Sequence, residues 1–368
     1  MNVHMVLMKA AIYREFCGPI RVETVPRPTL PSEDGVIIQV QATGVCRSDW
    51  HGWKGHDGDI KAHGLPFCPG HEVAGVIVQV GKKVRQFAPG DAVAIPFILS
   101  CGRCSSCAVR NRPTVCLEQE QPGFTMMGSY AEYLALPRAD RNLRKLPPNV
   151  SFVQAAALGC RFTTAFRALK QQGRLKSNES VAILGVGGLG LSCIMIAHAE
   201  QANPIVAVDI SPLALEKARQ LGATHTILAC KSDTAQDIQQ KLLKVAPYGV
   251  DVSVDAAGFL LTSEAAVYCT RVAGRMIQVG LPATSPPIPM GLVAGKELEL
   301  IGSHGFDAVD LPDLLEMVSM GKLDPAVLVE KEVTLEEGCQ ALMEMDKASP
   351  LGMVMITKFN DDSNTSRI

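Results

Sequence analysis

The segment Val181-Ala-Ile-Leu-Gly185-Val-Gly187-Gly188-Leu-Gly190 decides how the second half of this chain folds. Four apolar residues that suit a buried strand run directly into a glycine-rich loop, and the loop runs into a helix-compatible stretch, Leu191 to Ala199. A strand, a G-x-G-x-x-G loop and a helix in this order are typical of a dinucleotide-binding βαβ unit. The loop pattern alone also occurs in ordinary glycine-rich turns, so it is the flanking strand and helix that favour nucleotide binding.

Each residue of this loop has an expected task. Gly185 allows the tight turn after the strand, Gly187 lets the backbone approach a pyrophosphate, and Gly190 permits close packing of the helix. Gly188 and Leu189 complete the loop just before the helix, whose N-terminus favours anionic phosphates. We therefore expect these five residues to bind a dinucleotide.

Asp209 indicates which dinucleotide is bound. It closes the next strand, Ile205-Val-Ala-Val-Asp209, about 20 residues beyond the loop, where a carboxylate meets the adenosine ribose. A carboxylate there accepts hydrogen bonds from ribose hydroxyls and repels the 2′-phosphate of NADP, and no arginine follows it in Ile-Ser-Pro-Leu-Ala-Leu. The sequence favours NAD over NADP; the alternative is a solvated aspartate at a strand end.

Four of the twelve cysteines form a compact group. Cys101-Gly-Arg-Cys104-Ser-Ser-Cys107 is completed by Cys116. This spacing predicts a loop folded around a tetrahedral, all-thiolate zinc ion, which leaves no open position for a substrate and organises the backbone only. The alternative is a set of disulfides. We expect metal instead, because no signal peptide opens the chain and the other cysteines show no framework spacing, as in a reducing compartment.

Cys46, His71 and Cys160 form a second, dispersed group. Three ligands of mixed thiolate and imidazole type that leave a fourth position open are the composition of a catalytic zinc site. Their spacing alone does not select this interpretation. An isolated cysteine is usually a small core hydrophobe, and an isolated histidine is more often a satisfied core residue than a ligand.

Taken together, these motifs resemble those of the zinc-dependent medium-chain alcohol dehydrogenases, within the medium-chain dehydrogenase/reductase superfamily. Beyond the two loops, the matching segments are Gly44-Val-Cys-Arg-Ser-Asp-Trp-His51, Gly70-His71-Glu72, Pro89-Gly90-Asp91, Gly128-Ser-Tyr-Ala-Glu-Tyr133 and Leu158 to Ala165. The resemblance implies an α/β protein with a β-rich GroES-like catalytic domain and a Rossmann domain built on a doubly wound parallel sheet. We expect residues 1–152 in the catalytic domain, 153–299 in the NAD-binding domain, and 300–368 returning to complete the catalytic domain.

The resemblance also assigns chemistry to the dispersed group. Cys46, His71 and Cys160 would hold a catalytic zinc that polarises the substrate oxygen while hydride passes to or from NAD. Ser48 and His51 would relay the alcohol proton towards water. For His51 the alternative is a surface loop histidine.

Three neighbouring residues receive supporting roles from the resemblance. Asp49 would orient the metal-binding histidine, Glu72 would enter the metal coordination transiently, and Arg47 would contact the cofactor pyrophosphate. Each of them could instead be a plain surface side chain. The segment from Ala108 to Val115, between the last two cysteines of the compact group, is one residue longer than is usual in the family, so we expect it to bulge. Two zinc ions per chain are expected, one catalytic and one structural.

Composition agrees with these expectations. At 368 residues the chain is longer than a domain with a single hydrophobic core usually is, so we expect more than one domain. Its formal net charge of −2 disfavours a nucleic-acid or anionic-membrane partner. Glycines interrupt the longest apolar run, so we expect no membrane span. The family expectation is a homodimer or homotetramer. We expect a cytoplasmic location, and the C-terminal Ser366-Arg367-Ile368 points more weakly to a peroxisome-like organelle.

The expected function is therefore a zinc- and NAD-dependent oxidoreductase that interconverts a primary or secondary alcohol with its aldehyde or ketone. Two alternatives stay open. One is a polyol or other specialised carbonyl reductase that uses the same site. The other is a zinc-stabilised nucleotide-binding protein without turnover.

Overall fold

The computed structural model describes residues 6–347 and 351–359, and the chain divides into two compact units. Unit 1 comprises residues 1–160 and 305–368, and unit 2 comprises residues 161–304. The first boundary falls at residue 160 rather than 152 because helix α4 (Phe152–Ala157) packs against strands of unit 1. The second falls at 304 rather than 299 because β13 (Glu299–Gly302) pairs within the sheet of unit 2.

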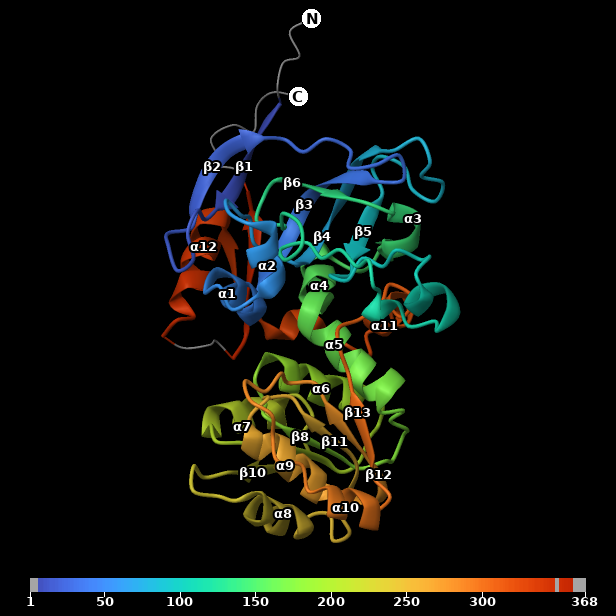
Figure 1. The fold of residues 1–368 in the computed structure, drawn as a ribbon, viewed down its shortest axis with the longest axis vertical. Helices are drawn as coiled ribbons and strands as arrows, with labels where there is room; N and C mark the ends of the chain where they lie inside the picture. Colours follow the sequence, from blue (N-terminus) through green and yellow to red (C-terminus); the bar gives the residue numbers. More distant parts are fainter. Residues whose placement is uncertain (1–5, 348–350, 360–368) are drawn as a thin grey trace, which may run out of the picture. The chain divides into compact units, whose positions relative to one another are not determined.

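Unit 1 is built on a seven-stranded sheet in the order β14-β15-β3-β4-β5-β7, with β6 paired to β3 (Figure 1). The strands are β3 (Val36–Val45), β4 (Glu72–Val80), β5 (Ala92–Ile95), β6 (Tyr133–Leu136), β7 (Arg144–Lys145), β14 (Val329–Thr334) and β15 (Met353–Lys358). A separate antiparallel pair is formed by β1 (Leu7–Ile12) and β2 (Arg21–Pro26). Val354 of β15 lies opposite Val45 of β3, so the last part of the chain completes the sheet that the first part begins.

Short helices surround this sheet. They are α1 (Arg47–Trp53), α2 (Gly58–His63), α3 (Ala139–Asn142), α4, α11 (Leu311–Ser319) and α12 (Leu335–Glu344). In Figure 1 the red helix α12 lies beside the blue strands β1 and β2, with which it is in contact. Strand β3 is buried along most of its length because the core packs on one side and α4 contacts it as well. Helix α4 contacts both β3 and β4, and α1 follows β3 in the chain.

Unit 2 is built on a six-stranded parallel sheet in the order β10-β9-β8-β11-β12-β13. Its strands are β8 (Val181–Leu184), β9 (Ile205–Asp209), β10 (His225–Leu228), β11 (Val250–Asp255), β12 (Thr270–Gln278) and β13. Numbered from β8, the order is 3-2-1-4-5-6, the doubly wound arrangement that the glycine-rich loop predicts. The direction of the order reverses between β8 and β11, and ligands of such sheets bind beyond the carboxyl ends of the strands at this point.

The helices of unit 2 are α5 (Thr163–Phe166), α6 (Gly188–Ala199), α7 (Pro212–Gln220), α8 (Ala235–Leu243), α9 (Leu260–Cys269) and α10 (Met290–Gly295). Helix α6 contacts β8, β9 and α7, whereas α8 and α9 pack against each other and α9 contacts β8, β11 and β12. Helix α6 starts directly after β8, so the glycine-rich loop lies at the point where the strand order reverses.

Two sequence expectations concern location. Among the helices of the described residues, none combines the length and apolar character needed to span a bilayer. The tripeptide Ser366-Arg367-Ile368 lies outside the described residues.

Candidate functional site

The dispersed group of predicted ligands comes together in unit 1. The donor atoms of Cys46, His71, Glu72 and Cys160 all lie within 4.8 Å of one another. Antiparallel pairing places Gly44 of β3 opposite Glu72 of β4, so the residues just beyond these strand ends are neighbours. Cys160 arrives from a π-helical turn, Leu158–Phe162, that follows α4. Single π-turns of this kind are frequent at functional sites.

Gly159 allows this turn to approach β4. A Cβ atom at this position would lie 2.5 Å from Cβ of Glu72 and 2.6 Å from its Cα, which no side chain can tolerate. The backbone N–H of Cys160 donates to Oε1 of Glu72 over 3.4 Å. No sequence pattern indicates this role for Gly159, because the requirement arises from the contact with a distant strand.

Asp49 holds the predicted histidine ligand in place. Its carboxylate is buried and accepts hydrogen bonds from Nδ1 of His71 at 2.9 Å, from the N–H of Gly70 at 3.0 Å and from the N–H of Cys46 at 3.3 Å. Because a carboxylate only accepts, Nδ1 of His71 must carry the proton. The other ring nitrogen, Nε2, then presents its lone pair.

This arrangement fits a zinc ion. Nε2 of His71 is buried and has no hydrogen-bond partner among the described residues. It lies next to two thiols and a carboxylate, which are donors that zinc accepts. Burial lowers the pKa of His71, but the charges of Asp49 and Cys46 outweigh it and raise the pKa well above its usual value. A cation at Nε2 is therefore electrostatically favoured.

Helix α1 carries the other predicted residues of this region. Ser48 is half-buried and His51 is exposed, and their i, i+3 spacing makes them neighbours on one helical face. Arg47 stacks on Trp50, with its guanidinium carbon 3.5 Å from the ring centre, and donates to the carbonyl of Met345. The predicted contact between Arg47 and a pyrophosphate stays a prediction.

His56 belongs to the surroundings of His51, and sequence reasoning missed it. The Nδ1 atoms of the two rings lie 3.1 Å apart. Although His51 is exposed, neighbouring groups displace part of the water around its ring, and this partial desolvation, followed by the positive charges of Arg47 and His56, lowers the pKa of His51. The five-residue interval between the histidines carried no signal, because they meet only through the turn after α1.

Two aromatic rings pack against the predicted metal ligand His71. The ring centre of Phe124 lies 5.0 Å from that of His71, and the ring centre of Phe97 lies 5.8 Å away. Both phenylalanines are buried. Sequence alone did not place either of them relative to the metal. Trp53 is a core residue whose Nε1 donates to the carbonyl of Gly18.

The compact group of cysteines also comes together in unit 1. All twelve cysteines lie in the described part of the chain, and none forms a disulfide. Sγ of Cys104 lies 3.5 Å from Sγ of Cys107 and 3.8 Å from Sγ of Cys116. These distances far exceed a sulfur–sulfur bond and approach the spacing of about 3.8 Å that tetrahedral ligands 2.3 Å from a zinc ion require.

Backbone N–H groups surround these sulfur atoms. Cys101 Sγ accepts from the N–H groups of Arg103 and Cys104, and Cys104 Sγ accepts from the N–H of Leu117. The bond from Leu117 is the main reason why the pKa of Cys104 falls to about 6. The pKa of Cys101 is lowered as well, so the structure favours the thiolate form, which binds zinc, at these two residues. Burial instead raises the pKa of Cys107 and Cys116.

The extra residue in this loop is taken up by a wide helical turn. A π-turn spans Ser105–Val109, with the N–H of Arg110 bonded to the carbonyl of Ser105 at 3.0 Å. A π-turn contains one residue more than an α-turn. The expected bulge is therefore a defined turn that leaves the four thiols together.

The glycine-rich loop has the shape that a phosphate cradle requires. Gly185 has a φ of +87°, which few other residues adopt. A Cβ at Gly190 would lie 2.0 Å from the carbonyl oxygen of Gly185, whereas a Cβ at Gly187 would meet nothing within 4 Å. Gly188 and Leu189 form the first turn of α6, which has no side-chain cap and no acidic residue. The open space beside Gly187 and the uncapped N-terminus of α6 fit an anionic ligand.

Asp209 is tied to this loop. Its Oδ2 accepts from the N–H of Val186 and its Oδ1 from the N–H of Ser211, both at 2.8 Å. A carboxylate has further lone pairs on both oxygens, so these bonds leave acceptor capacity for a ribose hydroxyl.

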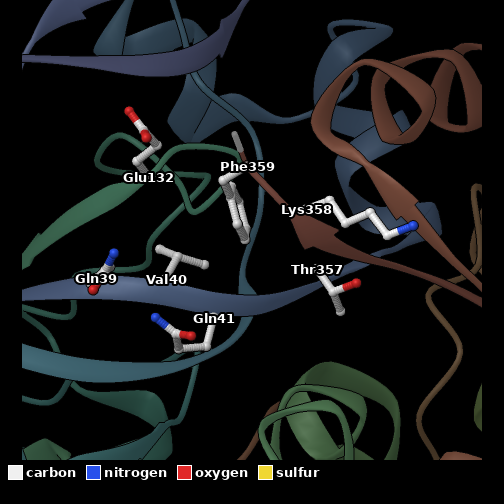
Figure 2. A pocket seen from close by; sticks show the side chains of 7 residues that line it. All are labelled: Gln39, Val40, Gln41, Glu132, Thr357, Lys358 and Phe359. Atoms are coloured by element: carbon white, nitrogen blue, oxygen red, sulfur yellow. The ribbon is translucent and has the colours of Figure 1, made fainter. Parts of the chain in front are cut away.

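The hollow drawn in Figure 2 is a different place in unit 1. It encloses about 250 Å³. Its lining comes from β3, the end of β15, the residue after β15 and the residue before β6: Gln39, Val40, Gln41, Glu132, Thr357, Lys358 and Phe359. None of these residues belongs to either donor cluster or to the glycine-rich loop. The candidate site is therefore assigned from the chemistry of the clusters.

A parallel nucleotide-binding sheet combined with a mixed thiolate and imidazole cluster defines the class of metal-containing dehydrogenases. Comparison with known proteins gives the family. Residues 32–148 match the "Alcohol dehydrogenase GroES-like domain" family, and residues 188–320 match the "Zinc-binding dehydrogenase" family.

Individual relatives agree. An alcohol dehydrogenase of Geobacillus stearothermophilus is 37% identical over 324 residues, which cover 88% of this chain and 92% of the relative. A sorbitol dehydrogenase of Bacillus subtilis is 31% identical over 91% of this chain and 92% of its own length. The solved structure of an alcohol dehydrogenase from Thermus sp. ATN1 matches with a TM-score of 0.86 and 30% identity, covering 95% of this chain and all of that one.

The chain therefore belongs to the zinc-dependent medium-chain alcohol dehydrogenase family. This confirms the expected fold class, a GroES-like part together with a Rossmann-type sheet. The protein is an oxidoreductase that interconverts alcohols and carbonyl compounds.

Proposed function

We propose that this chain is an NAD-dependent alcohol dehydrogenase with a catalytic zinc at Cys46, His71 and Cys160 and a structural zinc at the four-cysteine loop. The observation that carries the proposal is the buried Nε2 of His71, which lacks a hydrogen-bond partner among the described residues, in a group of four residues whose donor atoms lie within 4.8 Å of one another. A nucleotide-binding protein without turnover has no use for such a site.

At this site a zinc ion would polarise the substrate oxygen as a Lewis acid, and NAD would accept or return the hydride. Asp49 keeps the proton on Nδ1 of His71, so that Nε2 stays a ligand. Cys46 and Cys160 contribute negative charge that tempers the acidity of the metal. Glu72 supplies a further donor when no substrate is present.

Two residues of α1 move the proton. The hydroxyl of Ser48 takes the proton of the alcohol as it passes its own proton on, and the exposed imidazole of His51 accepts the relayed proton and releases it to water. Ser48 and His51 are neighbours on one face of α1, which supports these two roles in proton transfer.

The cofactor is proposed to be NAD rather than NADP. The carboxylate of Asp209 is fixed by Val186 and Ser211 beside the glycine-rich loop, where it would repel a 2′-phosphate. The phosphates are assigned to Gly185, Gly187, Gly188, Leu189 and Gly190.

The substrate is proposed to be a primary or secondary alcohol whose carbon chain is apolar next to the reacting carbon. Phe97 and Phe124, packed against His71, form an apolar surface beside the site. Because one relative is a sorbitol dehydrogenase, a polyol is the second candidate for the substrate. A higher kcat/KM for sorbitol or xylitol than for simple aliphatic alcohols would select that candidate.

The assembly is proposed to be a homodimer or homotetramer, paired through an edge strand of the parallel sheet. Strand β13 is such an edge and exposes Leu300. Light scattering on the purified protein tests this. A cytoplasmic location stays a prediction.

Elemental analysis tests the metal proposal. We expect two zinc ions per wild-type chain and one in a Cys46→Ser, Cys160→Ser double variant, with NAD-linked alcohol oxidation lost. A Cys17→Ser, Cys230→Ser variant, which changes two exposed thiols, is the matched control and should keep both ions and activity. Equal zinc in the wild type and the first variant would overturn the catalytic site.

A further inference from the structure

Gly305 begins the segment with which the chain returns to unit 1. Its φ is +55°, in the left-handed region that favours glycine. A Cβ at this position would lie 2.2 Å from Cδ1 of Ile98 and 3.2 Å from Cζ of Phe97. All three residues belong to unit 1. Both the backbone angle and the surrounding space therefore exclude a side chain at residue 305.

The two neighbours of Gly305 have little freedom to move aside. Ile98 is fully buried, and only 8% of Phe97 is exposed. Because protein interiors are closely packed, a buried side chain moves only by displacing others. Phe97 and Ile98 are also consecutive in the chain, so a displacement of one pulls on the backbone of the other.

Phe97 connects Gly305 to the candidate site. Its ring lies edge-to-face against the ring of His71, with the ring centres 5.8 Å apart and the planes at 74°. This arrangement is one that aromatic pairs prefer. The tip of the same phenylalanine ring, Cζ, is the atom nearest to Gly305. A side chain at residue 305 would therefore displace a ring that packs against the proposed metal ligand.

We propose that Gly305 is a positioning residue that sets the substrate range through Phe97. This inference rests on the proposed function, in which Phe97 forms part of the apolar surface for the substrate, and deepens it. The carbon chain of a longer alcohol covers more of this surface than ethanol does, so its binding depends more strongly on where the ring lies. We infer that the present position of Phe97 suits straight-chain primary alcohols of several carbons.

The ratio of kcat/KM for 1-hexanol to kcat/KM for ethanol tests the proposal. Both values come from the same preparation, so a partial loss of zinc or of folded protein cancels in the ratio. For Gly305→Ala we expect the ratio to fall about 10-fold or more, as for a misfit of one methylene in an apolar pocket. When Phe97→Leu is already present, adding Gly305→Ala should change the ratio little, because the effect passes through the ring.

Gly321 provides a matched control in unit 1. Its φ is +70°, and a Cβ there would meet no atom of the described residues within 4 Å. Gly321→Ala imposes a comparable backbone strain without touching a neighbour. It should lower the melting temperature and leave the alcohol ratio unchanged.

Melting temperature tests the packing without turnover. Ile98→Val removes the Cδ1 atom that a Cβ at residue 305 would meet. Combined with Gly305→Ala, it should recover part of the stability that Gly305→Ala loses. Ile98→Val should not stabilise Gly321→Ala, because residue 321 does not touch Ile98.

The outcomes separate the inference from the proposed function. An unchanged ratio in Gly305→Ala, an equal fall in Gly321→Ala, or a full further fall when Gly305→Ala is added to Phe97→Leu would each overturn the inference alone. If Gly305→Ala does not fold, the Gly305→Ala, Ile98→Val double variant takes its place with the same criteria. Wild-type protein that oxidises neither alcohol with NAD⁺ would overturn the proposed function and the inference with it.

Discussion

Nδ1 of His71 lies 2.9 Å from Oδ1 of Asp49, and both side chains are buried. The same carboxylate also accepts from the N–H groups of Gly70 and Cys46. One aspartate thus fixes the tautomer of one proposed ligand and the backbone beside two of them. The first prediction follows from this contact.

Asp49→Asn is expected to weaken zinc binding at the catalytic site about 10- to 100-fold, the usual cost of losing a carboxylate behind a metal-bound histidine. The structural zinc should be retained, because the hydrogen bonds of Asp49 go to His71, Gly70 and Cys46, which lie outside the four-cysteine loop. Zinc titration against a competing chelator measures this. Asp57→Asn is the control, since Asp57 caps α2 and should affect stability only. Equal zinc affinity in wild type and Asp49→Asn would contradict the prediction.

Local patterns predicted part of this site. The glycine-rich loop and the four-cysteine loop are short segments, and the spacing of their residues is enough to predict their geometry. In the structure the four thiols lie together and the glycines form the expected tight turn. Cys46, His71 and Cys160 have no such spacing, because they meet through the pairing of β3 with β4 and the packing of α4. Only the resemblance to a family connected them.

Other features could not be predicted from one sequence. Gly159 is required by its approach to Glu72, and Phe97 and Phe124 reach His71 from separate loops. Each of these features depends on a tertiary contact between segments far apart in the chain. Such a contact produces no regular residue spacing that could be recognised in the sequence.

Cys104→Ser is expected to remove the structural zinc and leave the catalytic one. The thiol of Cys104 lies within 4 Å of two other cysteine sulfurs, so its loss breaks the tetrahedral set. Because a closed zinc site stabilises the fold, we expect a lower melting temperature and faster proteolysis between Cys101 and Cys116. Cys230→Ser, at an exposed cysteine outside both clusters, should change neither quantity. An unchanged zinc count in Cys104→Ser would rule out the structural site.

The acid limb of the pH profile of kcat should report on His51. Its pKa is lowered by burial, Arg47 and His56, and raised only weakly by Cys46, so the imidazole stays neutral, and able to accept a proton, to lower pH than an ordinary histidine. If turnover requires neutral His51, activity is therefore lost only when the pH falls below this lowered pKa and the imidazole becomes protonated. His56→Asn removes one positive neighbour and should move the limb to higher pH, by up to about one unit.

Two variants check the assignment of that limb. His51→Gln should lower kcat by roughly 100-fold, the smaller end of the range for a general base, and added imidazole should restore part of it. His63→Asn, at a histidine whose ring packs on Phe67, should leave the profile unchanged. Persistence of the same limb in His51→Gln would assign it to another group.

Asp209→Ala should weaken NAD binding and reduce the preference over NADP. The variant loses the acceptor for ribose and also the bonds to the N–H groups of Val186 and Ser211, so NAD affinity should fall about 10-fold or more. NADP should lose less, because the repulsion of its 2′-phosphate disappears. Asp233→Ala is the control, since Asp233 pairs with Lys241 in the same unit. Wild-type protein that binds both cofactors equally would refute the assignment of Asp209.

Two glycines of the loop should respond to alanine in opposite ways. At Gly190 the new Cβ would lie 2.0 Å from the backbone oxygen of Gly185, and such overpacking costs about 1–3 kcal/mol or more of unfolding free energy. At Gly187 the space is open, and the backbone angles of φ −71° and ψ −163° suit any residue, so the fold should keep its stability. The Cβ of Gly187→Ala would instead occupy the space that a pyrophosphate needs. We therefore expect Gly187→Ala to melt like wild type and to bind ADP-ribose at least about 10-fold more weakly, as measured by calorimetry. Wild-type affinity in a fully folded Gly187→Ala protein would show that the phosphates do not approach the loop at this residue.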